Sequence, residues 1–193
     1  MNNDKIIKRR IGMNSDFNGT IIDIETIGEF DYNPVYEDDS RRVKNIQQVI
    51  LGLFGKKGIR IFCARGKDTI RELNSLTAQI LDRLERPFYA FNANFESGVW
   101  FHQLDKKIIF DGELQGFPRE NKGNARKSLG IPNYDDPFND DGYLCMIAWE
   151  RRQFEQAIAH NKACLLKERD ILLKRYLLLN KKCSAPFPFN FSK

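Results

Sequence analysis

The stretch TIIDIETIG, residues 20–28, decides the fold of this chain. Its β-branched residues and its closing glycine are typical of a short strand. Because side chains alternate between the two faces of a strand, Asp23 and Glu25 share one face. Ile22 and Ile24 point to the other face, into a core. The two carboxylates repel each other and lose solvation, so the pattern indicates either a site for a divalent cation or an edge strand whose acids face water.

The composition is ordinary for a soluble globular protein of one domain. Of the 193 residues, 41% are hydrophobic and 30% are charged, which is sufficient for a sizeable core. The net charge of +5 mildly favours polyanionic partners such as nucleic acid. No apolar run reaches the length of a membrane span, and the N-terminal residues lack the apolar core of a signal peptide. The four cysteines are widely spaced, which is typical of reduced thiols, so we expect a cytoplasmic protein with no membrane partner.

Apolar periodicity and chain-breaking residues predict alternating strands and helices after this first strand. The expected elements are a polar loop (29–45), a hairpin (48–55 and 58–64), a helix (69–85), a short strand (87–91), a helix (92–104), a further strand (107–111), an irregular region (112–141) with a helical turn near 125–129, and an almost entirely helical region (143–179). This order predicts an α/β domain over residues 18–182, with a basic segment 1–17 before it and an extended tail 183–193 after it.

Three motifs in this order resemble those of the DnaQ-like (DEDD) 3′–5′ exonucleases of the ribonuclease H-like superfamily. In that family the first strand supplies Asp-x-Glu, which here is Asp23 and Glu25. A second motif opens a helix after a later strand and here reads NANFE, residues 92–96, with Glu96 where the family has aspartate. The third motif, His-Asn-x-x-Asp, lies on a late helix and is degraded here to HNKAC, residues 160–164.

The resemblance covers roughly residues 18–180 and implies a ribonuclease H-like mixed sheet with helices on both faces. It also implies metal-dependent hydrolysis of DNA or RNA, from a single-stranded 3′ end. Such a reaction uses two Mg²⁺ or Mn²⁺ ions about 3.5–4 Å apart, held by carboxylates. The resemblance assigns Asp23, Glu25 and Glu96 as catalytic metal ligands, and His160 as the general base or the residue that positions the attacking water.

The third motif lacks its final carboxylate because a thiol, Cys164, stands in its place, and a thiol is a poor ligand for hard cations. On a continuous helix, 100° per residue places His160, Cys164 and Glu168 on one stripe. Asp170 lies on another face by the same arithmetic. We therefore expect Glu168 as the fourth metal ligand, with the acidic pair 140–141 as the second candidate.

The departures from the family motifs keep a second class of function open, which is a nuclease fold that has lost turnover and binds nucleic acid or a protein partner. Each candidate residue also has an ordinary structural interpretation. Glu96 can be a solvated acid at a helix start, and Glu168 can belong to a charged helix surface. A third possibility, endonuclease or transposase chemistry, requires an acid on a later strand, for which Asp111 is the only clear candidate.

Overall fold

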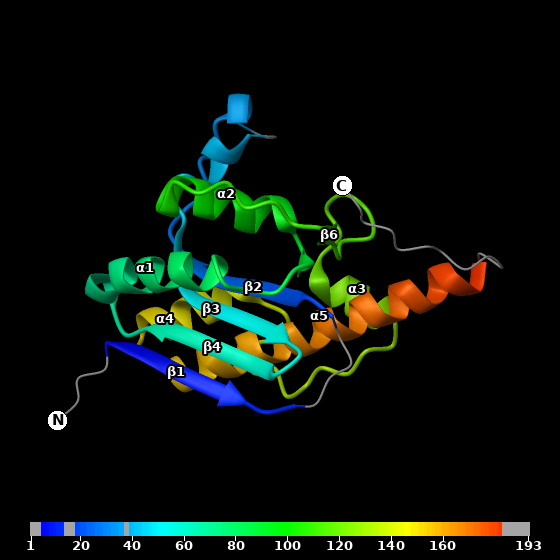
Figure 1. Cartoon of the computed structure of the whole chain (residues 1–193). Coiled ribbons are helices and arrows are strands. Elements are labelled where there is room, and N and C mark those ends of the chain that lie inside the picture. Colours follow the sequence, from blue (N-terminus) through cyan, green and yellow to red (C-terminus); the bar gives the residue numbers. More distant parts are fainter. Residues whose placement is uncertain (1–4, 14–17, 37–38, 183–193) are drawn as a thin grey trace.

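The computed structural model describes residues 5–13, 18–36 and 39–182 (Figure 1). Of the two flanking segments expected from the sequence, the tail 183–193 lies outside the described residues, as do parts of the basic segment 1–17. None of the described helices is both long enough and apolar enough to traverse a bilayer.

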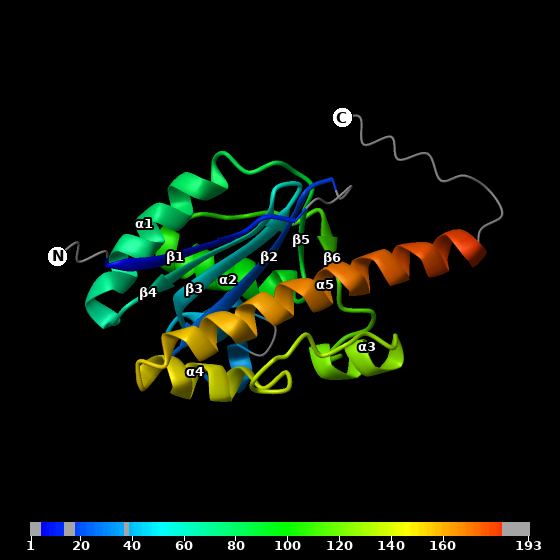
Figure 2. The same cartoon turned by 90° about the horizontal axis from the view of Figure 1, so that it is seen from below.

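A six-stranded mixed sheet forms the middle layer of the domain (Figures 1 and 2). Its strands lie in the order β1-β4-β3-β2-β5-β6. Their bounds are β1 Ile6–Ile11, β2 Thr20–Ile27, β3 Gln47–Gly55, β4 Gly58–Ala64, β5 Phe88–Ala90 and β6 Gly112–Glu113. Three pairs are antiparallel: β1 with β4, β4 with β3, and β3 with β2. The other two pairs, β2 with β5 and β5 with β6, are parallel. The predicted first strand and hairpin are confirmed, and β2 lies inside the sheet, which excludes the edge-strand alternative.

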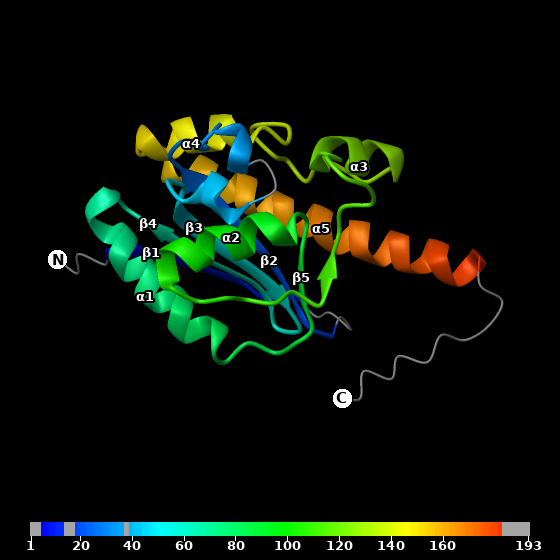
Figure 3. The same cartoon turned by 90° about the horizontal axis from the view of Figure 1, so that it is seen from above.

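Helices cover both faces of this sheet (Figures 2 and 3). On one face lie α1 Ile70–Leu81 and α2 Ala93–Leu104, and on the other lie α4 Gly142–Glu150 and α5 Phe154–Lys182. A shorter helix, α3 Lys122–Ser128, lies beside α5, and 3-10 turns occur at Pro34–Tyr36, Ser40–Val43 and Lys67–Thr69. The α/β class expected from the sequence is therefore confirmed.

Two strands at the edges of the sheet differ from expectation. Residues 6–11 were expected to be part of a loosely packed basic segment, but they form edge strand β1 because Ile6 and Ile7 are buried against the sheet. Residues 107–111 are expected to form a strand, but they contain no strand in the structure. The parallel pairing with β5 begins only at Gly112, since β5 itself is three residues long and offers few partners.

The second half of the chain is more regular than its composition predicts. The region expected to be irregular contains α3, which is longer than one turn because the Asn121 side chain accepts a hydrogen bond from the Asn124 backbone N–H and caps the helix. The helical region expected over residues 143–179, in two or three pieces, is confirmed and consists of two helices. Arg152, at a φ of 62°, separates α4 from α5, since a left-handed residue cannot continue an α-helix.

Candidate functional site

The acids of β2 open onto a cleft of about 270 Å³ between β2, the start of α2, α3 and α5. Its lining residues with ionisable side chains include Asp23, Glu25, Glu96, Lys122, His160 and Cys164. The structure thus brings together the predicted residues of all three motifs, although they come from separate parts of the chain.

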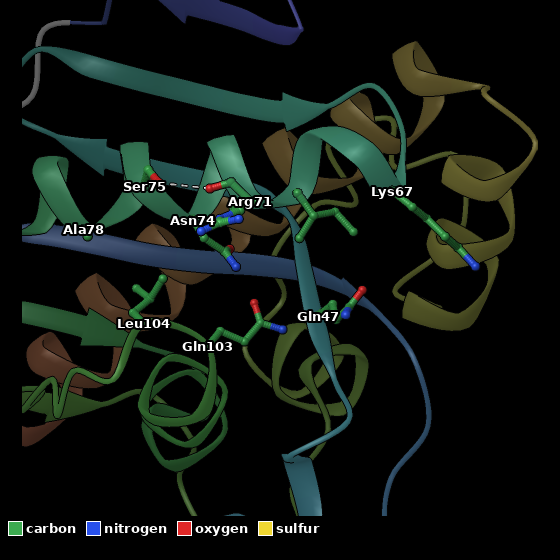
Figure 4. Close-up of a pocket in the computed structure, with 9 residues that line it drawn as sticks. Gln47, Lys67, Arg71, Asn74, Ser75, Ala78, Gln103 and Leu104 are labelled. Carbon is green, nitrogen blue, oxygen red and sulfur yellow. Dashed lines mark hydrogen bonds between the residues drawn. The ribbon is translucent and has the colours of Figure 1, made fainter.

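A second cavity, of about 490 Å³, lies between α1 and α2 (Figure 4). The side chains labelled there are Gln47, Lys67, Arg71, Asn74, Ser75, Ala78, Gln103 and Leu104. This lining has no carboxylate, imidazole or thiol, so it offers neither a general base nor an anionic metal ligand. We therefore assign the candidate site to the smaller cleft.

The carboxylates of Asp23 and Glu25 are buried, with 4% and 8% of each residue exposed. The side-chain amide of Asn161 on α5 donates to both, at 2.7 Å to Asp23 Oδ2 and at 3.4 Å to Glu25 Oε1. This contact requires a very close approach of α5 to the sheet. It is possible because β3 carries Gly52 opposite Asp23, where a Cβ atom would lie only 2.1 Å from Asn161 Oδ1.

An ammonium group, that of Lys122, sits between two carboxylates of the cleft. Its Nζ atom lies 2.7 Å from Asp23 Oδ1 and 2.6 Å from Glu168 Oε1. Burial would lower the pKa of Lys122, but the surrounding acidic groups, above all the negative charge of Asp23, raise it well above the usual value. Lys122 is therefore a fixed positive charge inside the cleft.

Glu168 lies beside the cleft, in contact with Lys122, on the helical stripe that it shares with His160 and Cys164. The residue is fully buried, and burial raises the pKa of its carboxyl well above the usual value. Asp170 points elsewhere, to Arg169 at 2.7 Å and to the Tyr134 hydroxyl. Glu168 is thus on the predicted face of α5, and Asp170 is on another.

The alternative pair 140–141 is engaged in other contacts. The Asp140 carboxylate accepts from Lys167 Nζ at 2.5 Å and from Arg126 Nε at 3.0 Å. The Asp141 side chain caps α4 by accepting from the backbone N–H groups of Tyr143 and Leu144. Asp140 borders the cleft, but both its oxygens are paired, so Glu168 remains the better candidate for a metal ligand.

Glu96 is buried at the start of α2, with only 4% of the residue exposed, which excludes the solvated alternative. Its position follows from the second motif, because Asn92 caps the helix by accepting from the Phe95 backbone N–H at 3.1 Å. Burial and the negative charge of Asp23 raise the pKa of the Glu96 carboxyl well above the usual value. Its Oε2 atom has no hydrogen-bond partner among the described residues.

His160 faces the acids of β2 from α5. Its Nε2 atom lies 3.8 Å from Glu25 Oε1 and 3.6 Å from Cys164 Sγ, and its Nδ1 atom lies 2.7 Å from Asp136 Oδ1. Burial would lower the pKa of His160, but the negative charge of Glu25 and the contacts with Cys164 and Asp136 raise it to about 11. The raised pKa favours the imidazolium form of His160 in the free protein, and its expected role as the general base or as the residue that positions the attacking water stays a prediction.

Two charged residues of the site, Lys122 and Asp136, belong to none of the three sequence motifs. Both lie in the segment 112–141, whose Gly, Asn, Pro and Asp content indicates only turns and loops. The fold carries them to the cleft across long sequence distances, 99 residues in the case of Lys122 and Asp23. Asn161, by contrast, is the second residue of the third motif, so the sequence itself points to it as a candidate site residue.

No protein-family model, no curated protein and no solved structure matches this chain. Its function is therefore inferred from the residues of the cleft and their geometry.

Proposed function

We propose that the protein is a divalent-metal-dependent nuclease that hydrolyses phosphodiester bonds of DNA or RNA, acting 3′–5′ on a single-stranded end. One observation carries the proposal: four buried carboxylates, Asp23, Glu25, Glu96 and Glu168, line one small cleft or contact a residue that does. Burying four acids together is costly unless cations or protons compensate them. The Lys122 ammonium contacts Asp23 and Glu168, and His160 faces Glu25, but Glu96 Oε2 and Glu168 Oε2 have no hydrogen-bond partner among the described residues.

The architecture is compatible with this function. The mixed sheet with helices on both faces, and the paired acids on an internal strand, support a ribonuclease H-like fold of the DnaQ-like (DEDD) type. The Asn-capped start of α2, which carries Glu96, and the His160-Asn161 pair on α5, which contacts Asp23, also support this assignment.

The donor set fits hard cations. Glu96 Oε2 and Glu168 Oε2 are buried without a hydrogen-bond partner among the described residues, so both need a cation or a proton. Mg²⁺ and Mn²⁺ prefer carboxylate oxygens and retain positions for water and substrate phosphate. Asp23, Glu25, Glu96 and Glu168 would hold one or two such ions.

The remaining residues of the cleft support phosphodiester hydrolysis in distinct ways. A bound pair of divalent ions would activate water and stabilise the leaving oxygen. Asn161 fixes the orientation of Asp23, and Lys122 offers a positive charge to the phosphate on which negative charge develops. His160, held by Asp136, can donate a hydrogen bond that positions a water or the phosphate.

The direct test is cleavage of end-labelled single-stranded DNA and RNA in the presence of Mg²⁺ or Mn²⁺, with a chelator as the blank. Asp23→Asn should abolish cleavage, because it removes a charge from the centre of the ligand set, while the metal-free protein remains folded or gains stability from reduced repulsion. The matched control is Asp82→Asn, which changes an exposed acid paired with Lys106. Undiminished cleavage by Asp23→Asn would rule out the assignment of this cleft.

A second candidate function is favoured by the position of Lys122. Its ammonium lies between Asp23 and Glu168, a position where a metal ion would otherwise lie, so the cleft can retain nucleic acid without hydrolysing it. In that case single-stranded oligonucleotides bind in the presence of chelator, and neither Mg²⁺ nor Mn²⁺ produces cleavage. Binding that falls steeply with salt would indicate phosphate contacts.

A further inference from the structure

Three different ligand atoms converge on the α5 side of the cleft. A carboxylate oxygen of Glu25, a ring nitrogen of His160 and the sulfur of Cys164 all lie within 4.8 Å of one another. All three residues are buried, with exposed fractions of 8%, 2% and 2%. One oxygen, one nitrogen and one sulfur donor form a mixed set that differs in chemistry from the carboxylates of Glu96 and Glu168.

We infer that Glu25, His160 and Cys164 form a site for one thiophilic divalent transition-metal ion of the Zn²⁺ type. Zn²⁺ accepts thiolate, imidazole and carboxylate ligands together, whereas a thiol offers little to Mg²⁺. The cysteine that replaces the carboxylate of the third motif therefore changes the metal preference of the site. This inference deepens the proposed function and rests on it for the role of the metal in catalysis, but metal binding is measured without substrate.

The spacing of His160 Nε2 from each of the other two ligand atoms fits a tetrahedral ion. Bonds of about 2.3 Å to sulfur and about 2.0–2.1 Å to nitrogen hold those two ligand atoms about 3.6 Å apart at a tetrahedral angle. The distance between Cys164 Sγ and His160 Nε2 is 3.6 Å. The same calculation gives about 3.4 Å between nitrogen and oxygen, and the distance between His160 Nε2 and Glu25 Oε1 is 3.8 Å. Small side-chain movements suffice to admit the ion.

The orientation of His160 is also that of a metal ligand. Histidines that bind metals typically donate their second ring N–H to a carboxylate, which fixes the ring and leaves the other nitrogen for the metal. Here the Nδ1 atom of His160 pairs with Asp136 at 2.7 Å, and Nε2 points to Glu25 and Cys164. Asp136 is itself held by Lys167 Nζ at 2.5 Å and by the Phe138 backbone N–H at 2.9 Å.

The site has room for a fourth ligand. Its three residues all line the cleft, so a tetrahedral ion would retain one position toward the solvent side, as catalytic zinc sites do. Lys122 does not compete for that side, since its Nζ atom contacts Asp23 and Glu168. Water or a phosphate oxygen would occupy the open position.

The experiment uses the full-length protein, stripped with chelator and titrated with Co²⁺ as a spectroscopic probe for Zn²⁺. We expect one equivalent of Co²⁺ to produce the charge-transfer absorption of a metal thiolate, and Zn²⁺ to abolish it by displacement. Cys164→Ser should eliminate the band and weaken metal binding by at least tenfold. The matched control, Cys63→Ser, changes a buried thiol of β4 that donates to the Ala64 carbonyl and does not line the cleft, and it should retain the band.

Two further variants keep the result decisive if Cys164→Ser does not fold. His160→Gln and Glu25→Gln each remove a different ligand and should each lower the affinity for Co²⁺ and Zn²⁺, with folding checked by circular dichroism. A Co²⁺ complex without a thiolate band, or a band that persists in Cys164→Ser, would overturn the inference. Zinc binding without any cleavage would support the inference and count against the nuclease. Mg²⁺-dependent cleavage with no thiolate band would overturn the inference and support the nuclease.

Discussion

Among single residues, Lys122 has the largest expected effect on the balance of charge in the cleft. Removal of one partner from a buried ion pair leaves an uncompensated charge and typically costs 3–5 kcal/mol, as an order of magnitude. Lys122 contacts two carboxylates at once, those of Asp23 and Glu168, so its ammonium does for the free protein what a bound cation would do.

We therefore expect Lys122→Met to lower the melting temperature of the chelator-treated protein by roughly 10 °C. Addition of Mn²⁺ should recover part of this loss, because a cation can then take the place between Asp23 and Glu168. Differential scanning calorimetry with and without Mn²⁺ measures both effects. The control Lys106→Met removes a surface ion pair with Asp82 and should change the melting temperature little. Equal melting temperatures for both variants would contradict the role of Lys122.

The titrating groups of the cleft predict how stability depends on pH in the metal-free protein. The pKa of Glu25 is raised from 4.5 to about 7, mainly by burial, so its stabilising contribution is complete below pH 4.5 and is lost as the pH rises to 7. The pKa of His160 is raised from 6.5 to about 11, so its contribution is complete below pH 6.5 and is lost toward pH 11. The pKa values of Glu96 and Glu168 are also raised, so their contributions to the free energy of unfolding also decrease as the pH rises.

All these contributions decrease with rising pH, so the melting temperature in chelator should fall between pH 5 and pH 9, by roughly 10 °C. Glu25→Gln should flatten the lower half of this curve, because the variant has no carboxyl to ionise there. Glu72→Gln, which changes an exposed acid paired with Lys5, serves as the control. A melting temperature that rises over this range would show that the acids are not buried together as described.

At the scale of elements, the position of α5 on the sheet depends on one glycine. The Asn161 amide group lies so near Gly52 that a Cβ atom there would be 2.1 Å from Oδ1, 2.9 Å from Cγ and 3.0 Å from Nδ2. Rotation of the amide alone does not relieve this contact, because all three atoms are close. Any side chain at Gly52 must displace α5, and with it His160 and Cys164.

Gly52→Ala should therefore destabilise the protein by about 1–3 kcal/mol, as overpacked core substitutions do. It should also impair metal binding and cleavage, since the hydrogen bond from Asn161 to Asp23 is lost. Urea unfolding and Co²⁺ titration of the same sample test the two effects. Gly12→Ala is the control, because no atom lies within 4 Å of a Cβ built at Gly12. Full activity in a stable Gly52→Ala protein would show that the packing of α5 tolerates an added methyl group.

At the scale of the whole molecule, the parts predictable from the sequence are those encoded by local patterns. Period-two alternation identifies β2, and helical periodicity identifies α1 and α5 and places Glu168 on the same stripe as His160. Edge strand β1 escaped prediction because only its first residues, Ile6 and Ile7, are buried. Lys122 and Asp136 escaped because their partners are set by tertiary structure, and no local pattern encodes which acid a loop residue will meet.

The hydrogen bond between Asn161 and Asp23 joins residues 138 positions apart. A ribosome adding 5–20 residues per second needs on the order of ten seconds to synthesise that span. Throughout that interval the emerging chain carries the acids of β2 without the amide that later holds them, and for the first 99 residues it also lacks the Lys122 ammonium. The cleft is consequently completed only after translation has passed α5, so a prematurely terminated product retains the acidic strand but none of the assembled site.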